Sequence, residues 1–253
     1  MVRFSAPLVA LAFAASARAQ VAPPAPPPEV KPNVSGVPGT PNQNAYDAEV
    51  PGVTLAILAP TEGQVLPEGD VAVRLDLRGY RVGPTIGQHV HVIVDNEPYI
   101  AHFDASAPLI LKGLARGSHV IRAFPARHYH LALKSGDVFQ TVTFSVGAPS
   151  EKPPFDAKGP FLTYSRPKGT YSEAEAKDGI LLDFWVRNVT LGKAAKVVYS
   201  VDGLDTTLSG WEAITLPPLA PGDHAIRLRL VDAAGRTISN GAFNDTTRTI
   251  TVK

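Results

Sequence analysis

Two pairs of histidines in this chain have the spacing of side chains that could hold a metal ion together. His89 and His91 stand two apart in GQHVHVIVD, and His128 and His130 stand two apart in ARHYHLALKSG. Neutral imidazole is a good ligand for Cu(II), Zn(II) and Ni(II). Since Met1 is the one methionine and cysteine does not occur, the sequence disfavours a soft Cu(I) site.

The first pair heads a run whose alternation is typical of a β-strand. Val90, Val92 and Val94 are expected to face a core, so His89 and His91 are expected to face away from it. Residues i and i+2 of a strand lie on one face, about 7 Å apart at Cα, and two imidazoles placed in this way can converge on one cation. A solvated strand face without an ion is the alternative that the spacing leaves open.

The chain contains an internal repeat. The segments LARGSHVIRAFPA and LAPGDHAIRLRLVD share the pattern L-A-x-G-x-H-x-I-R, which places His119 and His224 at equivalent positions. Upstream of them, VHVIVD is equivalent to VVYSVD, and VAVRLDL is equivalent to ILLDFWV, in the same order. A polar residue repeated at a tight turn usually satisfies backbone groups, so we interpret His119 and His224 as structural.

Each copy of the repeat predicts six or seven short strands in roughly 90 residues, a pattern that favours a β-sandwich. With a P-x-x-G turn at Pro60 and the L-x-x-G-x-H-x-[IV]-R turn, the chain resembles bacterial immunoglobulin-like and fibronectin type III-like modules over most of residues 53–253. The resemblance implies an all-β fold of two tandem sandwiches, each with two sheets and Greek-key connections. It implies little about activity.

The N-terminal region differs in composition from these modules. Arg3, a short apolar stretch and the A-x-A sequence at Ala17–Ala19 predict a secretory signal peptide that is cleaved after Ala19. The next residues are rich in proline and poor in apolar side chains, which predicts a disordered linker. The predicted segments are the signal peptide (1–19), the linker (20–52), domain 1 (53–147), a hinge (148–158) and domain 2 (159–253).

The expected strand order of the sandwich brings the two histidine pairs together. In an immunoglobulin-like sandwich the third strand begins beside the loop between the sixth and seventh strands, and this arrangement should gather Asp104 and five histidines at one pole of domain 1. Domain 2 has Lys196 and Val198 where domain 1 has the first pair. Two interpretations are open: a polar pole without a bound ion, or a copper(II) or zinc site in domain 1 alone, whose candidate ligands are His89, His91, His102, His128 and His130.

The stretch GQHVHVIVD is also similar to the G-x-H-V-H-x-x-x-D copper-ligand stretch of copper–zinc superoxide dismutases. This chain lacks that family's zinc-loop spacing of histidines and aspartate, and it lacks the family's structural cysteines. The unit is also shorter than a dismutase domain. We interpret the similarity as local and convergent. A dismutase-like copper activity is the one enzymatic function left open, because no nucleophile elbow, H-E-x-x-H motif or phosphate loop occurs.

Trp185 is a candidate for stacking on a sugar ring or docking a protein. In ILLDFWVRN, alternation directs Leu182 and Phe184 inward and Trp185 outward. The alternative is burial of Trp185 at the junction between the domains, since large aromatic residues are mostly buried.

The whole chain has the features of an exported binding protein. It has 253 residues, a net charge of +1 and scattered basic residues, which argues against nucleic acid as a partner. After signal cleavage, no segment is long and apolar enough to cross a bilayer. We expect a periplasmic or secreted, non-enzymatic binding or scaffolding module of the bacterial envelope, whose partner is an envelope protein or glycan. A periplasmic Cu(II)- or Zn(II)-binding protein is the alternative.

Overall fold

The computed structural model describes residues 50–134, 138–149, 154–208, 210–211 and 213–253. The predicted signal peptide (1–19) and residues 20–49 of the predicted linker lie outside this part of the chain, as do residues 150–153 of the predicted hinge. The described residues all belong to one compact unit, Pro32–Lys253. Among them, no helix is long and apolar enough to span a membrane.

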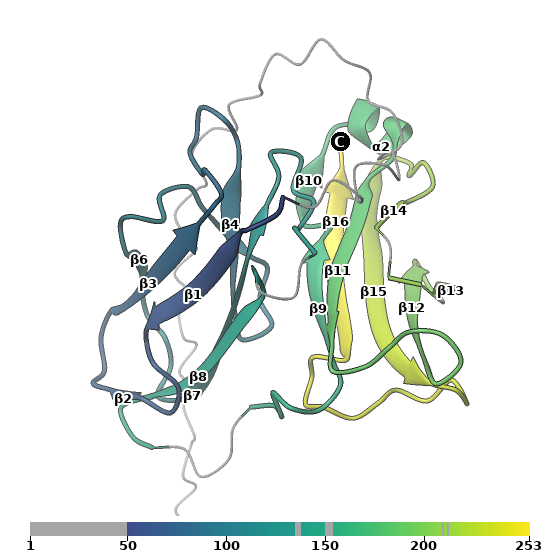
Figure 1. The fold of residues 1–253 in the computed structure, drawn as a ribbon. Coiled ribbons are helices and arrows are strands. Elements are labelled where there is room, and N and C mark those ends of the chain that lie inside the picture. Colours follow the sequence, from purple (N-terminus) through teal and green to yellow (C-terminus); the bar gives the residue numbers. More distant parts are fainter. Residues whose placement is uncertain (1–49, 135–137, 150–153, 209, 212) are drawn as a thin grey trace, which may run out of the picture. The chain divides into compact units, whose positions relative to one another are not determined.

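Residues 54–146 form the first β-sandwich, in which eight short strands make two sheets (Figure 1). The strands are β1 (Thr54–Ala59), β2 (Val65–Leu66), β3 (Val71–Arg78), β4 (His89–Val94), β5 (Ile100–His102), β6 (Leu109–Leu111), β7 (Gly117–Ala126) and β8 (Gln140–Val146). One sheet has the order β1-β3-β6, and the other has the order β2-β8-β7-β4-β5. The short pair β2 and β8 is parallel, and the other pairs are antiparallel.

Residues 161–252 form a second β-sandwich with the same connectivity. Its elements are β9 (Phe161–Arg166), β10 (Gly169–Tyr171), α2 (Glu173–Asp178), β11 (Leu181–Arg187), β12 (Ala195–Val201), β13 (Leu204–Leu208), β14 (Ile214–Thr215), β15 (Gly222–Asp232) and β16 (Asp245–Val252). The sheet orders are β9-β11-β14 and β10-β16-β15-β12-β13, so each strand takes the place of the strand eight positions earlier. This equivalence confirms the predicted repeat and the predicted all-β fold of two tandem immunoglobulin-like sandwiches.

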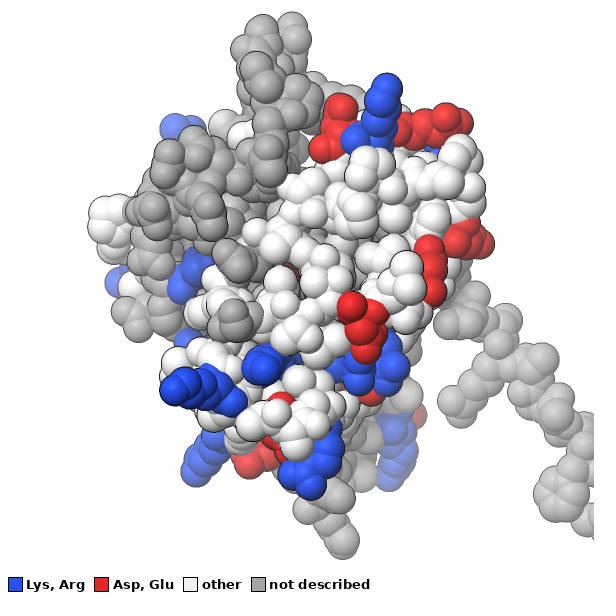
Figure 2. Space-filling model, turned by 90° about the vertical axis from the view of Figure 1, so that its right-hand side faces the viewer, with Lys and Arg blue, Asp and Glu red and all other residues white. Residues whose placement is uncertain are grey.

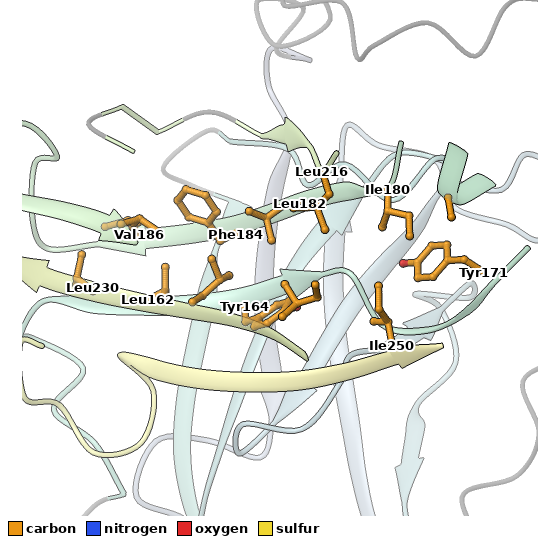
Figure 3. Close-up of a cluster of buried hydrophobic side chains, with 14 of the residues drawn as sticks. Leu162, Tyr164, Tyr171, Ile180, Leu182, Phe184, Val186, Leu216, Leu230 and Ile250 are labelled. Atoms are coloured by element: carbon orange, nitrogen blue, oxygen red, sulfur yellow. The ribbon is translucent and has the colours of Figure 1, made fainter. Parts of the chain in front are cut away.

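The core of each sandwich is built by alternation along its strands. In the first sandwich, Val90 and Val92 of β4 pack into the core, as predicted. In the second, Leu182 and Phe184 of β11 point into the layer that Ile250 also enters from β16 (Figure 3). Each such side chain contributes about 1.5–3 kcal/mol when it is fully buried.

A third apolar cluster joins the two sandwiches. It contains Phe124 and Phe139 of the first sandwich together with Phe161 and Trp185 of the second. The centroid of the Trp185 ring lies 5.0 Å from that of Phe139 and 6.1 Å from that of Phe124, and Trp185 is 0% exposed. Alternation correctly predicted that Trp185 and Phe184 lie on opposite faces of β11. The prediction of a ligand-stacking face at Trp185 is nevertheless wrong, because the first sandwich covers that face.

Arg122 of β7 crosses the same junction. Its side chain is buried, and its guanidinium donates hydrogen bonds to the Leu162 carbonyl (3.3 Å) and the Thr163 hydroxyl (2.9 Å) of β9. It also donates to the Asn96 side chain (3.2 Å) and lies 4.5 Å from the centroid of the Phe243 ring. Burial lowers the pKa of Arg122 to about 9, so the guanidinium remains charged at neutral pH and depends on these partners.

The short helix α2 was not predicted. It begins at a capping box in which the Ser172 hydroxyl accepts a hydrogen bond from the Glu175 backbone, while the Glu175 carboxylate accepts one from the Ser172 backbone. The S-x-x-E pattern in the sequence is the signal for this start.

The repeated histidines stabilise equivalent turns, as predicted. In the second sandwich, His224 Nδ1 lies 2.6 Å from the Asp202 carboxylate and Nε2 lies 2.8 Å from the Ala220 carbonyl. The first sandwich repeats this arrangement with His119, Asp95 and Ala115. Both ring nitrogens therefore face acceptors, which favours the protonated ring, and the hydrogen bond to the aspartate raises the pKa of each histidine.

We expect the His224→Gln variant to lose part of the pH dependence of stability. Because the pKa of His224 is raised in the folded state, its contribution is fully present below the unfolded pKa of about 6.5 and is lost as pH rises through the folded pKa. Urea unfolding from pH 5.5 to 8 should show wild type losing up to ~1 kcal/mol more than the variant. Equal slopes in the two proteins would assign the pH dependence to other groups.

Candidate metal centre

The structure brings together three of the five predicted ligands. His89 and His91 lie on β4, and His130 lies in the loop between β7 and β8. One ring nitrogen from each of the three lies within 4.8 Å of the others. His89 and His91 face away from the core of the first sandwich, as predicted, yet both are 0% exposed. His91 contacts Ser165 of the second sandwich, whereas the ring of His89 packs against Phe103 and His130 of the first.

The donor atoms are close enough to share an ion. The Nε2 atoms of His89 and His91 lie 3.0 Å apart, and His89 Nε2 lies 3.1 Å from His130 Nδ1. With metal–nitrogen bonds of 2.0–2.1 Å, neighbouring ligands of one ion stand about 2.9–3.4 Å apart. Both separations fall in this range.

The other nitrogens of the strand histidines have partners of their own. His89 Nδ1 lies 2.7 Å from the Gly87 carbonyl, which can only accept, so Nδ1 carries the hydrogen and Nε2 presents its lone pair. His91 Nδ1 lies 3.1 Å from the hydroxyl of Ser165 on β9. Metal-binding histidines usually have such a partner, which orients the ring. The second sandwich thus helps to orient a ligand of the first.

The backbone of the β7–β8 loop directs His130 inward. His130 adopts a left-handed conformation with φ of 69°, which costs about 1 kcal/mol or more outside glycine. Two backbone hydrogen bonds hold it there: His130 N–H donates to the Arg127 carbonyl (2.8 Å), and Arg127 N–H donates to the Leu131 carbonyl (2.9 Å). This turn explains why His130 joins the cluster while its neighbours in the loop do not.

The surroundings keep the three imidazoles neutral. Burial lowers the pKa of His89 to about 4 and that of His130 to about 2, and it holds the pKa of His91 well below its usual value. The charges of Arg166 and Lys168 lower all three pKa values further. Neutral rings offer lone pairs without first releasing a proton.

The other two predicted ligands lie apart from this cluster. His102 pairs with Val90 across β4 and β5, which puts it on the opposite face of the sheet, and its Nε2 donates to the Ala107 carbonyl (3.1 Å). His128 is exposed in the turn before His130. The H-x-H spacing places both rings on one face in a strand, but residues 128 and 129 form a turn. Asp104 accepts hydrogen bonds from Ser106 instead.

Sequence reasoning missed two residues at the centre, Tyr99 and Ser165. Tyr99 follows the turn after β4, and β5 pairs with β4 so that Ala101 lies opposite His91. Tyr99, two residues before Ala101, therefore falls on the face of His91, and this parity was a usable signal. Ser165 gave no signal, since it comes from the other sandwich.

Acidic and basic side chains both occur on the face of the molecule that Figure 2 shows, and no field of one sign covers it. Ion pairs such as Arg227–Asp245 (2.6 Å) place opposite charges side by side on the second sandwich. A face of mixed charge lacks the strong positive potential that a nucleic-acid surface uses.

Comparison with known proteins gives similar architectures at low similarity. No family model matches the chain, and no curated protein matches it. Among solved structures, fibronectin(III)-like modules of Clostridium thermocellum CbhA match with 15% identity and a TM-score of 0.29, over 79% of this chain and 94% of that one. The glucan-locus protein SGBP-B of Bacteroides ovatus, in complex with a mixed-linkage heptasaccharide, matches with 10% identity and a TM-score of 0.23, over 79% and 70%. Drosophila N-cadherin EC1-4 matches with 11% identity and a TM-score of 0.27, over 79% and 51%.

TM-scores this low carry no argument about function or ancestry. The assignment of the fold rests on the strand order and pairing of the two sandwiches.

Proposed function

We propose that this protein is an exported, non-enzymatic binding module whose first sandwich holds one Cu(II) or Zn(II) ion through His89, His91 and His130. The observation that carries the proposal is the convergence of three ring nitrogens in one buried cluster. The partners of His89 and His91, the Gly87 carbonyl and the Ser165 hydroxyl, support it because they fix the direction of both rings.

Burial also favours binding over catalysis. Two of the three ligands are fully buried and the third is half-buried, which limits the access of a substrate to the ion. The signal-like N-terminal sequence supports a periplasmic or secreted location, where a metal-binding envelope protein would act.

The test is a titration of the purified chain with Cu(II) and Zn(II). We expect one ion per chain with submicromolar affinity in wild type. The His89→Ala/His91→Ala variant should bind at least ~100-fold more weakly, because losing a residue that only orients a ligand already costs roughly 10–100-fold.

The matched control is His128→Ala, which removes an exposed imidazole from the same loop as His130. This variant should bind like wild type. Equal affinity of wild type and the double variant would contradict the proposal, and an equal loss in the control would point to general surface chelation.

The junction favours a second candidate function, that of a scaffold. The apolar cluster around Trp185 and the hydrogen bonds of Arg122 would hold the two sandwiches at a fixed spacing. Such a module would present a surface to an envelope protein or glycan. Cosedimentation with envelope fractions that is unchanged in the His89→Ala/His91→Ala variant would support this role independently of metal, and no cosedimentation would argue against it.

A further inference from the structure

Tyr99 lies against the three-histidine cluster. Its side chain is buried between β4 and β5, and its ring stacks on His91 with centroids 3.5 Å apart and planes inclined by 9°. The phenolic oxygen lies 3.0 Å from His130 Nδ1. A fourth donor atom is therefore in contact with one ring nitrogen of the cluster, His130 Nδ1.

The four donor atoms form a chain with nearly equal steps. From His91 Nε2 to His89 Nε2 the distance is 3.0 Å, from there to His130 Nδ1 it is 3.1 Å, and from there to Tyr99 Oη it is 3.0 Å. Each step fits the separation of about 2.9–3.4 Å between neighbouring ligands that bind one ion at 2.0–2.1 Å. The phenolic oxygen thus stands at ligand spacing from its neighbour in this chain, His130 Nδ1.

The positive charges near the cluster would favour an anionic fourth ligand over a neutral one. Arg166 and Lys168 both act on the three imidazoles, and Lys168 Nζ lies 3.9 Å from the centroid of the Tyr99 ring. In a buried site, these two nearby cations would weaken the binding of a divalent ion through neutral imidazoles alone. A phenolate would offset part of that charge, and Lys168 would stabilise the phenolate.

We infer that Tyr99 Oη is the fourth, anionic ligand of the ion, and that the resulting set of three nitrogens and one oxygen selects Cu(II) over Zn(II). The inference rests on the proposed three-histidine site. The metal replaces the phenolic hydrogen, which leaves to solvent as a proton, and the oxidation state of the ion does not change. A mixed nitrogen and oxygen set suits tetragonal Cu(II), which also binds such sites more tightly than Zn(II) does.

The test is a Cu(II) titration of the purified full chain followed by visible absorption. Wild type should develop an intense phenolate-to-Cu(II) charge-transfer band that saturates at one ion per chain. The Tyr99→Phe variant should lose this band and bind Cu(II) at least tenfold more weakly, while its affinity for Zn(II) changes less. Tyr129→Phe, a half-exposed tyrosine beside His130 in the sequence, is the matched control and should keep both the band and the affinity.

The results of this titration test the role of Tyr99 and the three-histidine site separately. Stoichiometric Cu(II) binding with the same affinity and spectrum in wild type and Tyr99→Phe would overturn the role of Tyr99 and leave the three-histidine site standing. No Cu(II) binding by wild type would overturn the inference about Tyr99, and binding of neither Cu(II) nor Zn(II) would overturn the three-histidine site as well. If Tyr99→Phe fails to fold, resonance Raman spectra of the Cu(II)-loaded wild type decide the matter, since the absence of enhanced tyrosinate modes rejects the ligand.

Discussion

Replacing Lys134 with methionine should lower the free energy of unfolding by ~3–5 kcal/mol, because the change leaves a carboxylate buried without its cation. Lys134 belongs to the β7–β8 loop of the first sandwich, and its Nζ lies 2.6 Å from Asp183 Oδ1 on β11 of the second. The Asp183 side chain is 0% exposed and that of Lys134 is 11% exposed. Lys134 also donates to the Phe184 carbonyl at 2.6 Å, so the variant loses two hydrogen bonds across the junction.

Urea unfolding at neutral pH measures this loss. The matched control is Arg227→Met, which removes one partner of the exposed pair Arg227–Asp245 and should cost no more than ~1 kcal/mol. Similar small costs in both variants would mean that water reaches Asp183. The Lys134→Met/Asp183→Leu double variant should recover much of the lost stability, since the uncompensated charge is then removed as well.

Replacing Trp185 with alanine should lower the free energy of unfolding by ~3–5 kcal/mol, since a large cavity opens at the junction. The indole is fully buried and packs against Phe124 and Phe139 of the first sandwich, and Trp211 lies 4.8 Å away in an edge-on orientation. The loss falls on contacts that join the sandwiches. Unfolding followed by circular dichroism should therefore change from one transition to two.

The matched control for Trp185→Ala is Leu204→Ala on β13. Leu204 is 78% exposed, so its removal should change the free energy of unfolding by less than about 0.5 kcal/mol. A cost below ~1 kcal/mol for Trp185→Ala, with one transition preserved, would show that the two sandwiches unfold together through other contacts.

The sequence contained enough information to predict the sandwiches. Period-two alternation and the repeated turn around His119 and His224 identified strands and their order, because those features depend on local packing and backbone hydrogen bonds. The same alternation placed His89 and His91 on the outer face of β4. It could not show that this face is covered, because the covering residues lie about seventy positions later in the chain, as Ser165 does.

The sequence predicted a residue of the candidate site correctly only where both the strand order and the strand register direct its side chain toward the cluster. His130 was gathered with His89 and His91 because the β7–β8 loop lies at the start of β4. The prediction that His102 joins this cluster was wrong. Sequence position alone does not show which face of the sheet a side chain takes, and the pairing of His102 with Val90 puts it on the core face. Tyr99 shares the parity of His91, but a tyrosine after a turn gives no strong sign of a ligand without the structure.

The buried side chain of Arg122 depends on residues that are synthesised after it. Its acceptors on Leu162 and Thr163 leave the ribosome some forty residues after Arg122 itself. Until then, the first sandwich would leave Phe124 and Phe139 uncovered, and exposed apolar surface of this kind promotes contact with other chains. Burial of this aromatic face would therefore have to wait until the second sandwich has been synthesised.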